Sequence, residues 1–184
     1  PHGGAEYIAA LCHCPTAYVA LGALCRAMGF VPVQLVQRLL SVTVGRTEPH
    51  MLCNCVEGAF RGYRQLSLGR GVRAGVGLAC WPFLDLRPSD MIEGARKALE
   101  YALLLPAPHI GQFGSLALNI SADKRHCRGD VFGAIEEYKL ALLADEDNVL
   151  AWNSLGVCLA SLGRHAEARR FFEEAIQRTP DDPA

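Results

Sequence analysis

The sequence predicts two parts of different fold class, an α/β part over residues 1–114 and an all-α part over residues 115–184. Apolar segments typical of strands and of helices alternate through the first part, which predicts a mixed sheet with helices packed on it. In the second part, small and aromatic residues recur at an offset of 34 positions, which predicts repeated helical hairpins.

Composition narrows the class of protein. The 184 residues are 51% hydrophobic, enough for two small domains, and the net charge of −1 provides no general attraction for nucleic acid. Eight cysteines are too few in a chain of this length for a disulfide scaffold, which favours a reducing, cytoplasmic location. Because the chain begins at Pro1 and not at Met, we expect it to be a piece of a longer protein.

The first part is expected to alternate between strands and helices. Residues 7–31 are largely apolar, but Pro15 and Arg26 interrupt them, so no membrane span is expected. Residues 71–80 are glycine-rich and apolar, which predicts a buried strand with close backbone neighbours. The expected elements are, in order, a strand at 5–12, helices at 16–29 and 32–41, mixed structure at 51–66, a strand at 71–80, a helix at 90–105 and a short strand at 109–118.

Three segments of the first part resemble the GGDEF family of diguanylate cyclases. The run from Gly3 to Tyr7 (GGAEY), followed by an apolar strand, is similar to the family signature. Residues 72–79 (VRAGVGLA) are similar to a later strand, and residues 90–103 to the closing helix, whose motif falls on residues 95–103 (ARKALEYAL). The resemblance implies an α/β nucleotide-binding fold in bacterial second-messenger signalling, with Gly3, Gly4 and Glu6 as vestiges of the nucleotide site.

The same resemblance implies that catalysis is lost. In that family an acidic residue of the signature holds the divalent metal ion, whereas here the position is Ala5, and the lysine of the closing helix is replaced by Leu103. We therefore expect a catalytically degenerate domain without a cofactor or metal, serving as a structural, dimerising or regulatory platform. The alternative is a relative that binds GTP with Mg²⁺, or cyclic di-GMP, through residues upstream of Pro1. For Glu6, the alternative to a nucleotide or metal contact is a solvated carboxylate on the surface.

Two C-x-C pairs could provide the ligands of a zinc site. Cys12 and Cys14, and likewise Cys53 and Cys55, would point the same way on a strand. Structural zinc sites more often use C-x2-C, because that turn wraps the metal, and cysteine often behaves as a small core residue. We therefore expect core cysteines, with zinc as the competing hypothesis.

The second part resembles the tetratricopeptide repeat. Residues 149–182 contain its W-x2-L-G opening, its A-x3-F pair, a later Ala and a closing Pro. The preceding copy, 115–148, matches mainly in its second helix. The matching positions are Trp152, Leu155, Gly156, Gly163, Ala168, Phe172, Ala175 and Pro180 in the later copy and Gly129, Ala134, Tyr138 and Ala141 in the earlier one.

The residue types suit packed antiparallel helices. Small residues such as Gly156 and Ala168 allow close approach of two helices, and Gly129 and Gly163 permit the tight turns between them. About three repeats are usually needed for stability, so we expect further contacts from a neighbouring domain, further repeats or another molecule.

The family resemblance implies a concave groove for a protein or peptide, lined by the first helix of each repeat. The candidate lining residues are Asn153, Val157 and Ala160. The Asn153 amide both donates and accepts hydrogen bonds, so it could hold a peptide backbone, or it could simply be a solvated helix residue. A homodimer is a further partner that the sequence allows.

Overall fold

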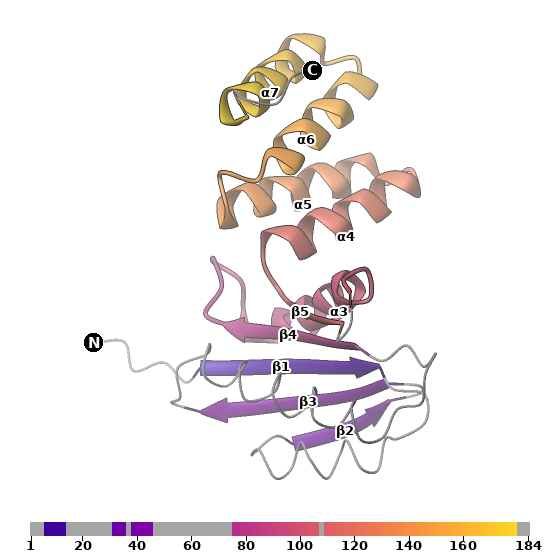
Figure 1. Cartoon of the computed structure of the whole chain (residues 1–184), viewed down its shortest axis with the longest axis vertical. Helices are drawn as coiled ribbons and strands as arrows, with labels where there is room; N and C mark the ends of the chain where they lie inside the picture. The colour runs from indigo at the N-terminus through magenta and orange to yellow at the C-terminus, as the bar shows by residue number, and fades with distance from the viewer. Residues whose placement is uncertain (1–5, 14–30, 36–37, 46–74, 107–108, 180–184) are drawn as a thin grey trace, which may run out of the picture. The chain divides into compact units, whose positions relative to one another are not determined.

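The computed structural model describes residues 6–13, 31–35, 38–45, 75–106 and 109–179. The chain divides into two compact units, Pro1–Phe113 and Gly114–Ala184. The described part of the first unit is a sheet with a helix, and that of the second unit is helical (Figure 1). No helix within these ranges combines the length and the apolar character that crossing a membrane requires.

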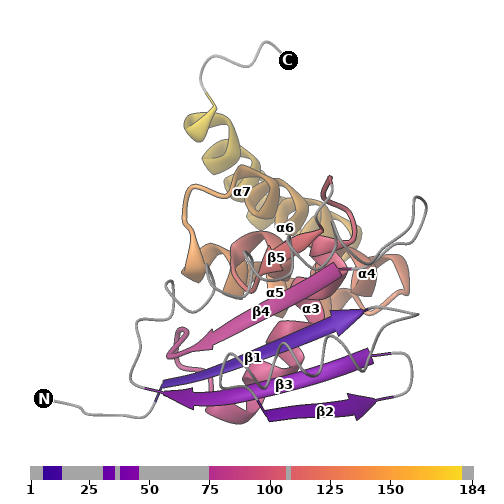
Figure 2. The same ribbon diagram turned by 60° about the horizontal axis from the view of Figure 1, so that its bottom comes forward.

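The described strands of the first unit are β1 (Glu6–His13), β2 (Val31–Leu35), β3 (Arg38–Gly45), β4 (Gly75–Trp81) and β5 (Ile110–Gln112). They form one mixed sheet with the order β2-β3-β1-β4-β5 (Figure 2). Neighbours are antiparallel except for β4 and β5, which are parallel. Central β1 pairs with both β3 and β4, so that Tyr7 lies opposite Val44 on one side and Trp81 on the other. β1 confirms the strand expected at 5–12 over residues 6–12, and β4 confirms the strand expected at 71–80 over residues 75–80. Residues 71–74, the helix expected at 16–29 and the mixed structure expected at 51–66 lie outside the described residues.

The prediction of a helix at 32–41 is wrong, because this stretch contributes to two antiparallel strands, β2 and β3. Val31, Val33 and Val42 are β-branched, and such residues favour the extended backbone. In the sheet β3 is hydrogen-bonded on both sides, by β2 and by β1. Pairing with residues distant in sequence therefore decided the conformation of this segment.

The sheet carries helix α3 (Met91–Ala102), which follows the short 3-10 turn η1 (Pro88–Asp90) and packs on β4 and β1. Its buried residues Met91, Ala95 and Leu99 form a core cluster with Ala79 of β4. A Cβ atom on Gly77 would lie 2.1 Å from the backbone nitrogen of Leu99. The glycine therefore permits the close backbone approach that the sequence predicts for this strand.

The last strand of the first unit is shorter than the stretch expected at 109–118. β5 covers Ile110–Gln112, after which the Phe113 amide donates to the Leu78 carbonyl oxygen at 2.7 Å. A new helix begins at Ser115. In its first turn the Leu118 amide donates to the Gly114 carbonyl oxygen at 3.0 Å. Helical hydrogen bonding therefore replaces strand pairing from this glycine on.

The second unit contains two helical hairpins, which confirms the all-α prediction for this part. The helices are α4 (Ser115–Cys127), α5 (Val131–Ala144), α6 (Val149–Ser161) and α7 (His165–Arg178). The turns within the hairpins contain Gly129 and Gly163, whose φ angles of 82° and 75° are left-handed. Glycine adopts this conformation without the steric cost that a Cβ atom brings.

A buried polar network joins the first three of these helices. The Asn148 side chain caps α6 by accepting the Ala151 amide at 3.1 Å. Its Nδ2 donates to Ser115 Oγ at 2.7 Å, and that hydroxyl donates to the Ala141 carbonyl at 2.8 Å. Buried polar groups are costly unless they are paired, so this chain of bonds specifies how the start of α4, the end of α5 and the start of α6 meet.

Candidate functional site

The small and aromatic positions of the repeat pattern lie where the hairpins pack. Ala134, Tyr138, Ala141, Leu155, Gly156, Ala168 and Ala175 are buried, and Phe172 is partly buried. Gly156 lies against Phe172, since a Cβ atom on the glycine would come within 2.6 Å of the ring. Pro180 lies outside the described residues. The pattern therefore describes contacts between helices, and function must be sought on the remaining faces.

Trp152 is a partly exposed residue of α6 that holds the second hairpin together. Its indole Nε1 donates to the Glu146 carbonyl at 2.7 Å, and its ring lies 5.5 Å from that of Phe171 on α7. The Arg178 guanidinium lies 4.6 Å from the Trp152 ring centroid, within range of a cation–π interaction. An open hollow of about 240 Å³ beside these rings is lined by Trp152, Glu167, Arg170, Phe171 and Glu174.

The three candidate groove residues of α6 differ in their surroundings. Asn153 is exposed, Val157 is 43% exposed and Ala160 is half-buried. Val157 lines an open pocket of about 220 Å³, whereas Asn153 and Ala160 are not among its lining residues. The role predicted for all three residues in holding a partner stays a prediction, and Val157 is the one that the pocket includes.

This pocket, called here the concave pocket, lies between three helices. Its lining residues come from α4 (Asp123, His126, Cys127), α5 (Tyr138) and α6 (Ser154, Val157). The pocket thus combines one carboxylate with an imidazole, a thiol, a phenol and a hydroxyl, beside the apolar side chain of Val157.

Hydrogen bonds hold the carboxylate of the concave pocket in place. The Tyr138 hydroxyl donates to Asp123 Oδ1 at 2.6 Å, and the Asn119 amide nitrogen lies 3.4 Å from Asp123 Oδ2 as a second donor. Burial, and then the bond to Asp123, raise the pKa of Tyr138 well above its usual value, so the phenol keeps its proton. Burial also raises the pKa of the nearby Cys158 thiol, with a further contribution from the Asp123 charge.

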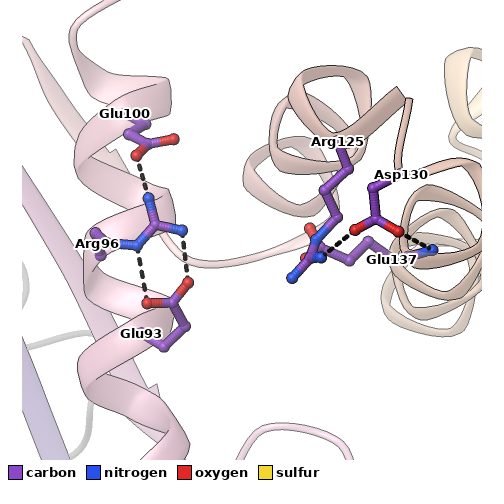
Figure 3. Close-up of polar contacts among 7 residues, drawn as sticks. Glu93, Arg96, Glu100, Arg125, Asp130 and Glu137 are labelled. Carbon is purple, nitrogen blue, oxygen red and sulfur yellow. Dashed lines mark hydrogen bonds and ion pairs between the residues drawn. The ribbon is translucent and has the colours of Figure 1, made fainter. Parts of the chain in front are cut away.

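The neighbouring arginine of α4 is engaged with the second helix of its own hairpin. Arg125 pairs with Asp130 through Nη1 and with Glu137 through Nε, each at 2.6 Å (Figure 3). The Arg125 guanidinium, and then the amide of Gly133, hold the pKa of the Asp130 carboxyl below its ordinary value. This cluster fixes the turn between α4 and α5.

A second ionic cluster lies on α3 of the first unit. Arg96 bonds Glu93 through Nε at 2.8 Å and also pairs with Glu100 (Figure 3). These pairs, led by the bond to Glu93, raise the pKa of Arg96 above its ordinary value. Their spacing of three and four residues is typical of partners that stabilise a helix surface.

Sequence reasoning did not select most of the concave pocket. It treated Tyr138 as a packing residue and left out Asp123, His126, Cys127 and Ser154. A signal was present, because subtracting the repeat offset of 34 from Val157 and Ala160 leads to Asp123 and His126. Applying the groove prediction to both copies would have found two of the polar lining residues.

The candidate residues of the first unit cannot be placed as a site. Gly3 and Gly4 lie outside the described residues, and of Glu6 only the backbone, at the start of β1 opposite Gly45, is described. The same holds for the C-x-C pairs, of which only the backbone of Cys12 is described. Among the side chains that the structure describes, no group of three or more His, Cys, Asp or Glu residues is placed to hold a metal ion.

The comparison with known families bears on the second unit. The tetratricopeptide repeat family matches residues 128–183, which include α5, α6 and α7. No curated protein matches the chain. Tetratricopeptide repeats stack into surfaces that bind other proteins, so the match suggests a protein-interaction role for this unit.

Proposed function

We propose that the chain is a protein-interaction adaptor whose repeats hold a segment of a partner protein on the face that contains the concave pocket. The observation that carries the proposal is the coincidence of the repeat match with an open, partly polar pocket between successive helices. Peptide recognition commonly combines apolar contacts with a few polar groups that fix orientation, and Val157 together with Asp123, Tyr138 and Ser154 offers that combination.

For the first unit we propose a catalytically degenerate GGDEF-like domain that couples the adaptor to bacterial signalling. This part of the proposal is supported by the sequence signature around Gly3 and Gly4, by the segment 72–79 and by Ala5 at the metal-binding position. A strand that begins at Glu6, and β4 with α3 packed on it, are compatible with it. The first unit would also mediate a homodimer. A measurement of the molar mass of the chain in solution tests this.

Selection from a random peptide display library tests the adaptor function. We expect the wild-type chain to enrich peptides that lose binding in the variant Val157→Arg, because the long side chain would fill the concave pocket. The matched control is Leu143→Arg, at a residue of α5 that is 72% exposed and outside the pocket. Failure of the folded chain to enrich any peptide, or equal losses in both variants, would contradict the proposal.

Calorimetric titration tests the proposal for the first unit. GTP and cyclic di-GMP are added separately to the chain with and without Mg²⁺, and product formation from GTP is followed in parallel. We expect no turnover and no saturable heat. Saturable, Mg²⁺-dependent GTP binding that Glu6→Ala weakens would instead support the nucleotide-binding alternative, since the family resemblance assigns that carboxylate to the nucleotide site.

A further inference from the structure

The carboxylate of Asp123 lines the concave pocket and is held there by hydrogen bonds. Its two hydrogen bonds among the described residues come from neutral donors, the Tyr138 hydroxyl and the Asn119 amide. The Asn119 side chain is 4% exposed, and its Oδ1 has no hydrogen-bond partner among the described residues. The Asn119 amide thus turns its nitrogen to the carboxylate and leaves its buried oxygen without a partner, which costs free energy.

No counter-ion balances this carboxylate within the described chain. No Lys or Arg of the described residues lines the concave pocket or forms an ion pair with Asp123. Arg125, two residues further along α4, is committed to Asp130 and Glu137. Neutral donors thus orient Asp123, and no described side chain forms an ion pair with it.

The pocket lies beside the last turns of α4, which ends at Cys127. The basic residues Lys124, Arg125 and His126 of the last turn already complement the partial negative charge of the helix C-terminus, so the attraction for a partner cation comes from the Asp123 carboxylate. The apolar side chain of Val157 provides a surface for the methylene stem of a long basic side chain, whose charged head would reach the carboxylate.

We propose that the concave pocket binds a lysine or arginine side chain of the partner segment, with its cationic head on Asp123. This inference rests on the proposed adaptor function and specifies the chemistry of the partner. Charge complementarity selects this occupant over an acidic segment or a terminal carboxylate, which Asp123 would repel. A metal ion is a poorer occupant: His126 and Cys127 also line the pocket, but no group of three or more His, Cys, Asp or Glu side chains among the described residues is placed to hold one.

The test uses peptide libraries in which one central position is fixed and the others are degenerate. The fixed residue is lysine, arginine, norleucine or glutamate, and binding to the complete chain is measured by fluorescence polarisation. Norleucine keeps the four-carbon stem of lysine and lacks its ammonium group. We expect the lysine or arginine library to bind about tenfold more tightly than the norleucine library, the effect of one charge-assisted hydrogen bond.

Two variants locate the preference on the protein. Asp123→Asn keeps the side-chain shape and an acceptor for Tyr138, and we expect it to remove the preference for the basic libraries. Asp147→Asn makes the same chemical change at an exposed residue outside the concave pocket and should leave the preference intact. The comparison of libraries on the wild-type chain tests the inference even if Asp123→Asn does not fold.

The outcomes separate this inference from the adaptor function. Equal binding of the lysine, arginine and norleucine libraries, all abolished by Val157→Arg, would overturn the basic side chain and keep the adaptor function. A preference for basic residues that persists in Asp123→Asn would also overturn the inference. Binding of no library to the folded chain would overturn both.

Discussion

The two helical hairpins of the second unit share a sequence pattern and differ in what they bury. At one pair of positions related by the offset of 34, Ile135 on α5 is 4% exposed and the Arg169 side chain on α7 is 81% exposed. Helix α5 packs against both α4 and α6, whereas α7 packs against α6. The comparison teaches that the neighbours of a repeat, and not only its own pattern, determine which positions must be apolar.

A similar contrast separates the faces of α4 and α6. Where α4 has Asp123 and His126, α6 has Val157 and Ala160 at the equivalent positions. Equivalent backbone positions thus present a charged surface in one hairpin and an apolar one in the next. None of these four side chains is fully buried, so core packing leaves them free to differ between repeats, as the proposed partner site requires.

The largest effect is expected from Ile135→Ala. Removing most of a buried isoleucine side chain loses transfer free energy and leaves a cavity, so the free energy of unfolding should fall by about 3 kcal/mol. Urea denaturation followed by fluorescence measures it, in a Trp81→Phe background, so that Trp152, the other of the two tryptophans, reports on the repeats.

The equivalent change in the other hairpin serves as the control. Arg169 pairs with Glu173 at 2.8 Å on an exposed surface, where ion pairs contribute little. Arg169→Ala should therefore lower the free energy of unfolding by no more than about 0.5 kcal/mol. If the two substitutions had similar effects, the contrast in burial between α5 and α7 would have no energetic meaning.

Asn148→Ala should follow, with a loss of about 2 kcal/mol in the free energy of unfolding. The substitution removes the cap of α6, and it takes away the Nδ2 donor of the buried Ser115 hydroxyl. The measurement is the same denaturation experiment. Asn148→Ser offers a matched comparison, because serine can cap the helix but is too short to keep the bond to Ser115, so an intermediate loss is expected.

Gly156→Ala gives the later hairpin the residue type that the earlier hairpin has at the equivalent position, Ala122. The added Cβ atom would come within 2.6 Å of the Phe172 ring, which must move. We expect a loss of about 1 to 2 kcal/mol from this overpacking, measured by chemical denaturation. We expect the free energy of unfolding to recover in part when Phe172→Leu is combined with Gly156→Ala. If it does not recover, the loss does not come from the contact with the Phe172 ring.

The smallest effect concerns the helix starts, and it depends on pH. Asp130 caps α5 by accepting the Gly133 amide at 3.0 Å, whereas Arg164 at the equivalent position of α7 makes no side-chain cap. The pKa of Asp130 is lowered in the folded chain, chiefly by Arg125. Its contribution is therefore present above the ordinary value of 3.8 and is lost as the pH falls through the lowered folded pKa.

Asp130→Asn tests this prediction, because asparagine also caps helices but does not titrate. Stability is measured from neutral to strongly acidic pH for both proteins. Below the ordinary aspartate pKa the wild type should lose more stability than the variant. Parallel pH profiles would show that the charge of Asp130 contributes nothing beyond its capping bond.

Much of the second unit could be predicted from local sequence. Small residues such as Gly156 and Ala168 are required wherever two helices of a hairpin approach closely, and Gly129 and Gly163 are required by the left-handed turns. The contacts between the two helices of a hairpin join residues close in sequence, so a short pattern contains the information for them. The match of the tetratricopeptide repeat family over residues 128–183 agrees with that reading.

Pairing between distant residues limited the prediction of the first unit. Strands β2 and β3 were predicted as a helix, since β-propensity depends on cross-strand neighbours that a local pattern does not contain. In contrast, β4 was predicted correctly because Gly77 marks the backbone approach of α3 in the sequence itself. The GGDEF-like assignment remains a prediction that rests on short motifs.

The sequence by itself determined the helical hairpins, their turns and their packing positions, because each depends on residue size and backbone conformation within a few turns of chain. The tertiary structure alone decided the concave pocket. Asp123 and Tyr138 are 15 residues apart and belong to different helices, and Ser154 and Val157 come from a third. Only the stacking of one hairpin on the next places the carboxylate, its phenolic donor and the apolar wall in contact with the same space.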